Sequence, residues 1–202
     1  MMPPIVSPLC TVCGIPFTGA GHDHVCGSCS ISSFRFDAAR AAFAYEGASR
    51  DLIHSFKYRN KTHLRRPLAL LTIERLAEFI DLRQPDLIMP VPLHRKKLSS
   101  RGFNQAVLIG EIFSQRLRIP LDRRNLSRVR WTEPQVNLAA DERRTNVKGA
   151  FAIKEPGLVN GRRVLLVDDV LTTGSTADEC ARVLKSAGAA AVTVVTVARA
   201  LG

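Results

Sequence analysis

The chain has 202 residues, 46% of them hydrophobic, which allows one complete globular domain with a small appended module. Lys and Arg outnumber Asp and Glu by 29 to 18, and the resulting net charge of +11 favours anionic ligands such as phosphates or nucleic acid. No apolar run is long enough to cross a bilayer, and residues 1–9 lack the features of a signal peptide, so we expect a cytoplasmic protein without membrane insertion.

Two Cys-x-x-Cys pairs lie near the start of the chain, and they consist of Cys10, Cys13, Cys26 and Cys29. Four thiolates can form the closed tetrahedral site of structural zinc. A disulfide framework is unusual in a cytoplasmic chain, and a redox motif needs one pair only. His22 and His24 could replace one thiolate, but we expect them to be loop residues. The sequence therefore predicts a zinc ribbon at 1–35, which either binds nucleic acid or a protein, or caps the main domain at 36–202.

The main domain is expected to begin with a strand at 36–45 and a helix at 48–57. A basic turn that includes Lys57 follows, and then a longer amphipathic helix at 65–82. None of these elements carries a motif, so we expect all of them to be structural.

A second buried strand is predicted at 86–92, where two prolines end it. We expect a loop at 93–105, with Asn104 as the cap of the next helix. The basic side chains of this loop are His94, Arg95, Lys96, Lys97 and Arg101. Because a loop after a parallel strand lies at the carboxyl edge of the sheet, this one could neutralise a pyrophosphate group bound there.

A long basic segment occupies 123–149, and its polar residues are Arg123, Arg124, Arg128, Arg130, Gln135, Arg143, Arg144 and Lys148. Residues 83–148 together hold fourteen basic and six acidic side chains. Arg130 and Trp131 could stack on a base of single-stranded nucleic acid. The alternative is a solvated basic loop.

The stretch at 164–176 contains the strongest motif of the chain. Its apolar start predicts a strand buried on both faces, and an acid pair and a hydroxyl-rich turn follow: Asp168, Asp169, Thr172, Thr173, Gly174, Ser175 and Thr176. We expect a helix after the turn, with a capping box between Thr176 and Glu179 and with Gly188 as its C-terminal cap. A strand at 191–198 completes a βαβ unit.

The turn has the chemistry of a phosphate site. It enters a helix N-terminus, where free N–H groups and the helix dipole attract anions. Gly174 would let the backbone approach a ligand closely, and the neighbouring hydroxyls add donors. Asp168 and Asp169 suit ribose hydroxyls or a hydrated Mg²⁺ ion instead. The motif thus predicts a ligand that contains ribose 5-phosphate.

Val-Leu-Leu-Val-Asp-Asp-Val-Leu-Thr-Thr-Gly-Ser-Thr at 164–176 resembles the phosphoribosyl pyrophosphate (PRPP) loop of type I phosphoribosyltransferases. Pro-Val-Pro-Leu-His at 90–94 and Arg-Gly-Phe-Asn-Gln at 101–105 extend the resemblance. With the four cysteines, nearly the whole chain is similar to the ComF family, which comprises phosphoribosyltransferase-like proteins linked to DNA uptake in competent bacteria.

The resemblance implies a parallel α/β sheet flanked by helices, the type I phosphoribosyltransferase fold, behind the zinc ribbon. It implies that PRPP binds with Mg²⁺, with its 5-phosphate on residues 172–176 and its ribose on Asp168 and Asp169 as the catalytic residues. The pyrophosphate would face the loop at 93–101. The earlier part of 123–149 would correspond to the hood that closes over PRPP and excludes water.

Two classes of function follow from this resemblance. The first is a glycosyltransferase, in which pyrophosphate leaves C1 of the ribose and an unidentified amine or base attacks it. The second is a non-catalytic protein that senses PRPP or a nucleotide, or that binds single-stranded DNA beside the zinc ribbon, together with other DNA-uptake proteins. Turnover of PRPP would favour the first class, and DNA affinity that falls steeply with salt would favour the second.

Overall fold

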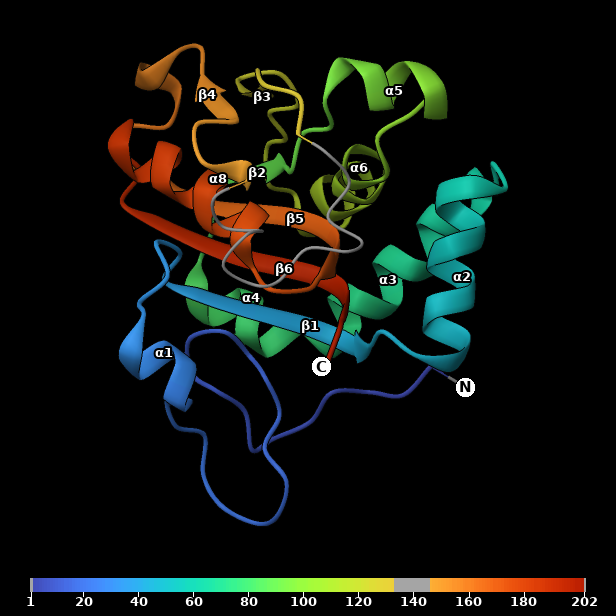
Figure 1. Cartoon of the computed structure of the whole chain (residues 1–202), viewed down its shortest axis with the longest axis vertical. Helices are drawn as coiled ribbons and strands as arrows, with labels where there is room; N and C mark the ends of the chain where they lie inside the picture. The colour runs from blue at the N-terminus through green and yellow to red at the C-terminus, as the bar shows by residue number, and fades with distance from the viewer. Residues whose placement is uncertain (1, 133–145, 202) are drawn as a thin grey trace.

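The computed structural model describes residues 2–132 and 146–201 of the chain. Its centre is a four-stranded parallel sheet in the order β1-β6-β5-β2, with helices on both faces (Figure 1). The four strands are β1 (Ala38–Ala44), β2 (Leu87–Pro90), β5 (Arg163–Leu171) and β6 (Ala191–Arg199). Beside the sheet, β3 (Leu126–Arg128) and β4 (Phe151–Ile153) form an antiparallel pair. The predicted parallel α/β fold is confirmed.

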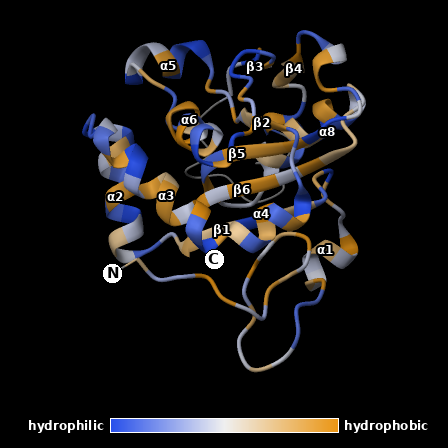
Figure 2. Ribbon diagram, turned by 180° about the vertical axis from the view of Figure 1, so that it is seen from behind, coloured by the Kyte–Doolittle hydropathy of each residue, from blue (hydrophilic) through white to orange (hydrophobic). Residues whose placement is uncertain are grey.

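Side chains of β5 alternate between two hydrophobic clusters, one on each face of the sheet. Val164 and Leu166 point into the cluster under α8 (Ser175–Ser186). Leu165 and Val167 point into the opposite cluster. Because both faces are covered, the central strands can be apolar at nearly every position, and Figure 2 shows β5 and β6 as largely hydrophobic.

The second cluster is covered by four helices, which are α2 (Gly47–Tyr58), α3 (Arg65–Arg75), α4 (Ala77–Arg83) and α6 (Gln105–Leu117). Asn104 caps α6 as predicted, because its side chain accepts the N–H of Ala106. The helix predicted at 65–82 is interrupted, since Leu76 leaves helical geometry and separates α3 from α4. A short 3-10 turn, η1 (Thr62–Leu64), precedes α3, and η3 (Pro156–Leu158) begins the turn before β5. No sequence signal marks the break at Leu76.

Two local predictions around the motifs were wrong. The expected loop at 93–105 contains a short helix, α5 (Arg95–Arg101), because His94 accepts the N–H of Lys96 at its start and Gly102 ends it with a φ of 82°. The expected capping box of α8 is absent, because Glu179 turns away from Thr176. Its carboxylate accepts the N–H of Gly149 at 2.7 Å and pairs with Arg182 at 2.8 Å.

The register of the strands places the motifs together at one edge of the sheet. Pro90, the last residue of β2, pairs with Val167 of β5, the residue before the acid pair. The chain that leaves β2 therefore runs beside Asp168 and Asp169, as the motif spacing predicts.

The N-terminal segment lies along the outer edge of β1. Ile5 donates its N–H to Ala42 O at 3.1 Å, and Ala39 donates its N–H to Val12 O at 2.7 Å. The segment thus covers an edge that would otherwise expose unpaired backbone groups. It includes the short helix α1 (Gly27–Ile31), and the division of the chain at residue 35 stays a prediction. Among the described residues, none of the helices combines the length and apolarity that crossing a membrane requires.

Candidate functional site

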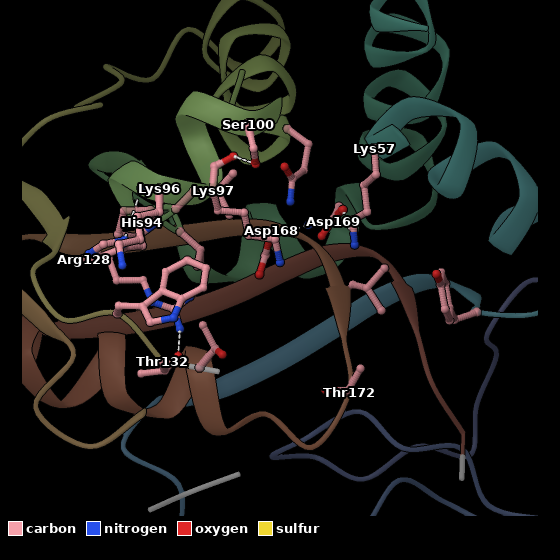
Figure 3. Close-up of a pocket in the computed structure, with 18 residues that line it drawn as sticks. Lys57, His94, Lys96, Lys97, Ser100, Arg128, Thr132, Asp168, Asp169 and Thr172 are labelled. Atoms are coloured by element: carbon pink, nitrogen blue, oxygen red, sulfur yellow. Dashed lines mark hydrogen bonds and ion pairs between the residues drawn. The ribbon is translucent and has the colours of Figure 1, made fainter. Parts of the chain in front are cut away.

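A pocket of about 570 Å³ opens at the carboxyl edge of β5 and β2. It is lined by the acid pair, by basic residues from three elements and by the hydroxyls at both ends of the turn (Figure 3). The lining residues that matter here are Tyr45, Lys57, His94, Lys96, Lys97, Arg128, Trp131, Thr132, Asp168, Asp169, Thr172 and Thr176. The pocket therefore combines groups suited to hydroxyls with groups suited to phosphates.

The two acids occupy different environments. Asp169 is 3% exposed, and its Oδ2 lies 2.7 Å from Nζ of Lys57. Asp168 accepts the N–H of Asp169 at 2.8 Å. Burial, together with the negative charge of Asp169, raises the pKa of Asp168 to about 8, and Lys57 opposes this shift only in part. Asp169 thus forms an ion pair with Lys57, whereas burial favours the protonated form of Asp168.

Lys57 is the main pocket residue that the sequence analysis missed, because its element was expected to be structural. It belongs to the last turn of α2, at the end of the helix predicted at 48–57, and it lines the pocket. Burial acts to lower its pKa, but the attraction of Asp169 and Asp168 outweighs burial and raises it. The available signal was its spacing, because Lys57 follows the fully buried Ile53 by four residues and so lies on the same helix face.

The opposite end of the pocket is cationic. His94, Lys96 and Lys97 come from α5 and its cap, and Arg128 comes from β3. Burial and the nearby Arg101 lower the pKa of Lys97, and burial lowers the pKa of Arg128. The buried Nε of Arg128 has no hydrogen-bond partner within the described part of the chain. Such a set of partly desolvated cations is suited to an anionic ligand.

Two of the predicted cations do not line the pocket. Arg101 donates to Oε1 of Gln105 at 2.6 Å and lies over the ring of Tyr58 at 5.0 Å. Arg95 is also outside the lining. Trp131 does reach the pocket, where Lys96 Nζ lies 5.6 Å from the centroid of its ring and the His94 ring packs against it in a T-shaped arrangement, with centroids 5.2 Å apart.

Only the two ends of the hydroxyl-rich turn line the pocket, namely Thr172 and Thr176. The hydroxyls of Thr173 and Ser175 lie 2.9 Å from each other. Gly174 has a φ of 81°, and a Cβ built there would lie 3.1 Å from the ring of Phe34. The glycine is therefore required by the backbone and by a side chain that packs behind it. Ligand contact by residues 173–175 stays a prediction.

The basic segment after β3 is described in part. Arg130, for which the sequence left open either base stacking or a solvated loop, donates to the carbonyl oxygens of Asn146 at 2.8 Å and Lys148 at 2.7 Å. Its guanidinium is thus engaged by the chain itself. The other candidates of this segment, Gln135, Arg143 and Arg144, lie outside the described residues.

The four N-terminal cysteines form a second site. Their sulfur atoms lie within 4.8 Å of one another, and those of Cys13 and Cys26 are 3.8 Å apart. Four sulfurs at the usual zinc–sulfur distance in a tetrahedron are also about 3.8 Å apart. Backbone N–H groups of Cys13 and Cys26 point at Cys10 Sγ, at 3.4 and 3.3 Å. The cluster could therefore hold a metal such as zinc.

The remaining predictions about thiols and histidines agree with this picture. Cys180 lies on α8 and is fully buried, as expected for a core residue. His24 stacks on Phe17 with ring centroids 3.8 Å apart and is not part of the metal-binding group.

Comparison with known proteins places this arrangement among relatives. The family model of the phosphoribosyl transferase domain matches residues 104–201. DNA utilization protein YhgH of Escherichia coli (strain K12) is 36% identical over 197 residues, which cover 96% of this chain and 85% of that protein. Competence protein F of Haemophilus influenzae is 35% identical over 179 residues, or 87% of this chain and 78% of that protein. Purine phosphoribosyltransferase from Pyrococcus horikoshii Ot3 has 21% identity and a TM-score of 0.40, with 66% of this chain and 84% of that chain covered.

Proposed function

Since the chain belongs to the ComF family, together with relatives named for competence and DNA utilization, we propose that it binds PRPP in the pocket at the carboxyl edge of β5. The observation that supports this most directly is the meeting of three groups in one cavity. Thr172 and Thr176 lie at the start of α8, the acids lie beside them, and the cations lie opposite. A phosphorylated ribose with a second anionic group matches this distribution of charge.

The proposed placement of PRPP follows from the lining. The 5-phosphate lies at the N-terminus of α8 with residues 172–176, and the ribose hydroxyls face Asp168 and Asp169. The pyrophosphate faces Lys96, Lys97 and His94, and Arg128 adds a fourth basic side chain that the resemblance did not supply. Arg95 and Arg101 receive no contact in this placement.

The proposed reaction class is phosphoribosyl transfer. The bond between C1 of the ribose and the pyrophosphate oxygen breaks, pyrophosphate leaves with the electron pair, and the acceptor forms the new bond to C1. Lys96, Lys97 and Arg128 stabilise the charge that develops on the leaving group. Mg²⁺ bound with PRPP would add to this stabilisation. Asp168 would be the nearer of the two acids to serve it, because Asp169 already pairs with Lys57 at 2.7 Å.

The first experiment is a calorimetric titration of the full chain with PRPP and Mg²⁺. We expect saturable binding in the wild type and its loss in the double variant Asp168→Asn, Asp169→Asn. The double variant Asp51→Asn, Asp81→Asn removes the same charge from exposed positions and should bind as the wild type does. Absence of binding in the wild type would contradict the proposal.

A second candidate function, single-stranded DNA binding in a DNA-uptake role, is favoured by the net charge of +11 and by Trp131 among the cations of the pocket. Its signature is an affinity that falls steeply with salt and weakens in Trp131→Ala. For the cysteine cluster we propose structural Zn²⁺.

A further inference from the structure

We propose that Arg199 is the counter-cation of a zinc–tetrathiolate centre formed by the four N-terminal cysteines, so that zinc binding depends on the charge of a residue of the central sheet. This inference rests on the zinc that we propose for the cysteine cluster. Arg199 is the last residue of β6 and is 7% exposed. Its Nη1 donates to Cys13 O at 2.7 Å, and its Nη2 lies 3.8 Å from Cys13 Sγ.

The positive charge of Arg199 has no carboxylate to balance it among the described residues. None of the ion pairs in this part of the chain includes Arg199. Its buried Nε also lacks a hydrogen-bond partner within residues 2–132 and 146–201. A buried charge without a counter-charge is costly, because little water remains to solvate it. The sulfur atoms beside Arg199 are therefore the place where a balancing negative charge is expected.

A zinc ion held by four thiolates supplies this negative charge. The thiolates carry four negative charges and the ion carries two positive ones, so the centre keeps two negative charges. Protonated thiols without a metal are neutral and offer Arg199 no such charge. Arg40 also donates to Cys10 O, at 3.1 Å, but Asp23 Oδ2 lies 3.8 Å from its Nη2 and offsets its charge. Arg199 is therefore the cation that balances the centre.

The backbone fixes Arg199 in this position. Its strand lies between β1 and β5, where Arg199 pairs with Ala44 and Leu171. Its carbonyl oxygen accepts the N–H of Tyr45 at 2.7 Å. The side chain reaches from the sheet to the N-terminal segment, which runs below β1 in Figure 1. Because a guanidinium is planar and presents its donors as a rigid fork, it can serve the carbonyl oxygen and the sulfur of Cys13 together.

The alternative is that Arg199 serves the ribbon only as a hydrogen-bond donor to Cys13 O. The two roles differ in what a substitution removes. Gln keeps a donor group but loses the charge, whereas Lys keeps the charge but loses the planar fork. The roles also differ in their dependence on the metal, because a hydrogen bond to a carbonyl oxygen does not require zinc.

The test measures the zinc affinity of the full chain by competition with a chromogenic chelator. We expect Arg199→Gln to lower the affinity by about tenfold to a hundredfold, the usual effect of removing a group that supports the metal ligands. Arg199→Lys should stay within about threefold of the wild type, since the charge remains. The matched control is Arg163→Gln, because Arg163 lies at the opposite edge of the sheet and pairs with Asp86. This control should bind zinc as the wild type does.

Thermal unfolding in zinc and in EDTA guards against a general loss of folding, because zinc raises the melting temperature of a folded chain that binds it. We expect Arg199→Gln to lower the melting temperature in zinc. In EDTA it should leave the melting temperature unchanged or raise it, since the variant then removes an unbalanced buried charge.

Three results would overturn the inference while the proposed zinc stands. They are an equal loss of melting temperature in both buffers, a zinc affinity of Arg199→Gln within about threefold of the wild type, and an Arg199→Lys variant that binds zinc as weakly as Arg199→Gln. A wild-type chain that binds no zinc would overturn both.

Discussion

The predicted cysteine ribbon at 1–35 and the pocket at the carboxyl edge of β5 arrange their polar groups differently. In the ribbon, the four thiols lie together, and Cys10 Sγ accepts two backbone N–H groups. Arg199 and Arg40 donate to the carbonyl oxygens of Cys13 and Cys10. In the pocket, cations crowd one end. A buried Nε without a hydrogen-bond partner among the described residues occurs in both regions, at Arg128 beside the pocket and at Arg199 beside the ribbon. The ribbon's sulfur atoms lie within reach of one another, whereas the charged groups of the pocket line an open cavity.

The two regions nevertheless contact the same side chain, that of Phe34. Phe34 packs against the cysteine cluster on one side and lies against Gly174 of the hydroxyl-rich turn on the other. The backbone N–H of Arg35 donates to Asp178, in the first turn of α8, at 2.5 Å. The ribbon, whose cysteines could hold a metal, therefore packs behind the turn that borders the pocket.

The largest expected effect comes from breaking the ribbon. Cys26→Ser should remove stoichiometric zinc and lower the free energy of unfolding by several kcal/mol, because metal binding contributes directly to the folding of so small a module. Metal analysis and thermal unfolding measure both effects. Cys180→Ala, which changes a buried thiol away from the cluster, should keep the zinc and cost only about 1 kcal/mol. Wild-type protein that holds no zinc would contradict the proposal that the four cysteines bind structural zinc.

The next effect tests the contact that Phe34 makes with both regions. Phe34→Ala should lower the free energy of unfolding by about 2 kcal/mol, since Phe34 is partly buried, and should weaken PRPP binding because Gly174 loses the ring behind it. Phe17→Ala is the matched control, because Phe17 packs on the cysteine cluster without contacting Gly174. Equal loss of PRPP affinity in both variants would show that the ribbon acts through general stability alone.

The sequence predicted those parts of the molecule whose chemistry is contiguous. The strand, acid pair and hydroxyl-rich turn fall within thirteen residues at 164–176, and the cysteine spacing alone predicts a cluster. Short uninterrupted apolar runs also predicted the strands of the parallel sheet, because strands buried on both faces are apolar throughout. The short helix α5 was not predicted, although its N-cap His94 and its C-cap Gly102 bracket it in the sequence.

The remaining features depend on distant contacts. Lys57 and Asp169 are 112 residues apart, and nothing near either residue indicates the other. The sequence analysis assigned Gly174 to ligand approach, whereas the structure places Phe34, 140 residues earlier, against it. Glu179 likewise does not cap α8 as predicted, and its carboxylate instead accepts hydrogen bonds from Gly149 and Arg182. Tertiary contacts override local propensity at each of these positions.

The last predictions concern the pH dependence of stability. They compare an acid inside the pocket, Asp168, with one at the far end of the same strands, Asp86. Arg163 holds Asp86 through paired hydrogen bonds at 2.8 and 3.0 Å and lowers the pKa of Asp86 to about 2, whereas burial raises that of Asp168 to about 8. The contribution of Asp86 to stability is therefore present above the unfolded pKa near 4 and lost as pH falls to about 2.

The contribution of Asp168 to stability changes with pH in the opposite direction. Its raised pKa leaves stability unaffected below about pH 4 and lowers it progressively as pH rises to about 8, because only the unfolded chain releases this proton easily. Asp168→Asn should thus raise the melting temperature at pH 8 and leave it unchanged at pH 4. Asp86→Asn should lower it slightly at pH 7 and not at pH 2, since the pair is partly exposed. Melting curves of both variants in metal-free buffer measure these shifts, and a loss of stability in Asp168→Asn at pH 8 would mean that the pocket is not strained in the absence of ligand.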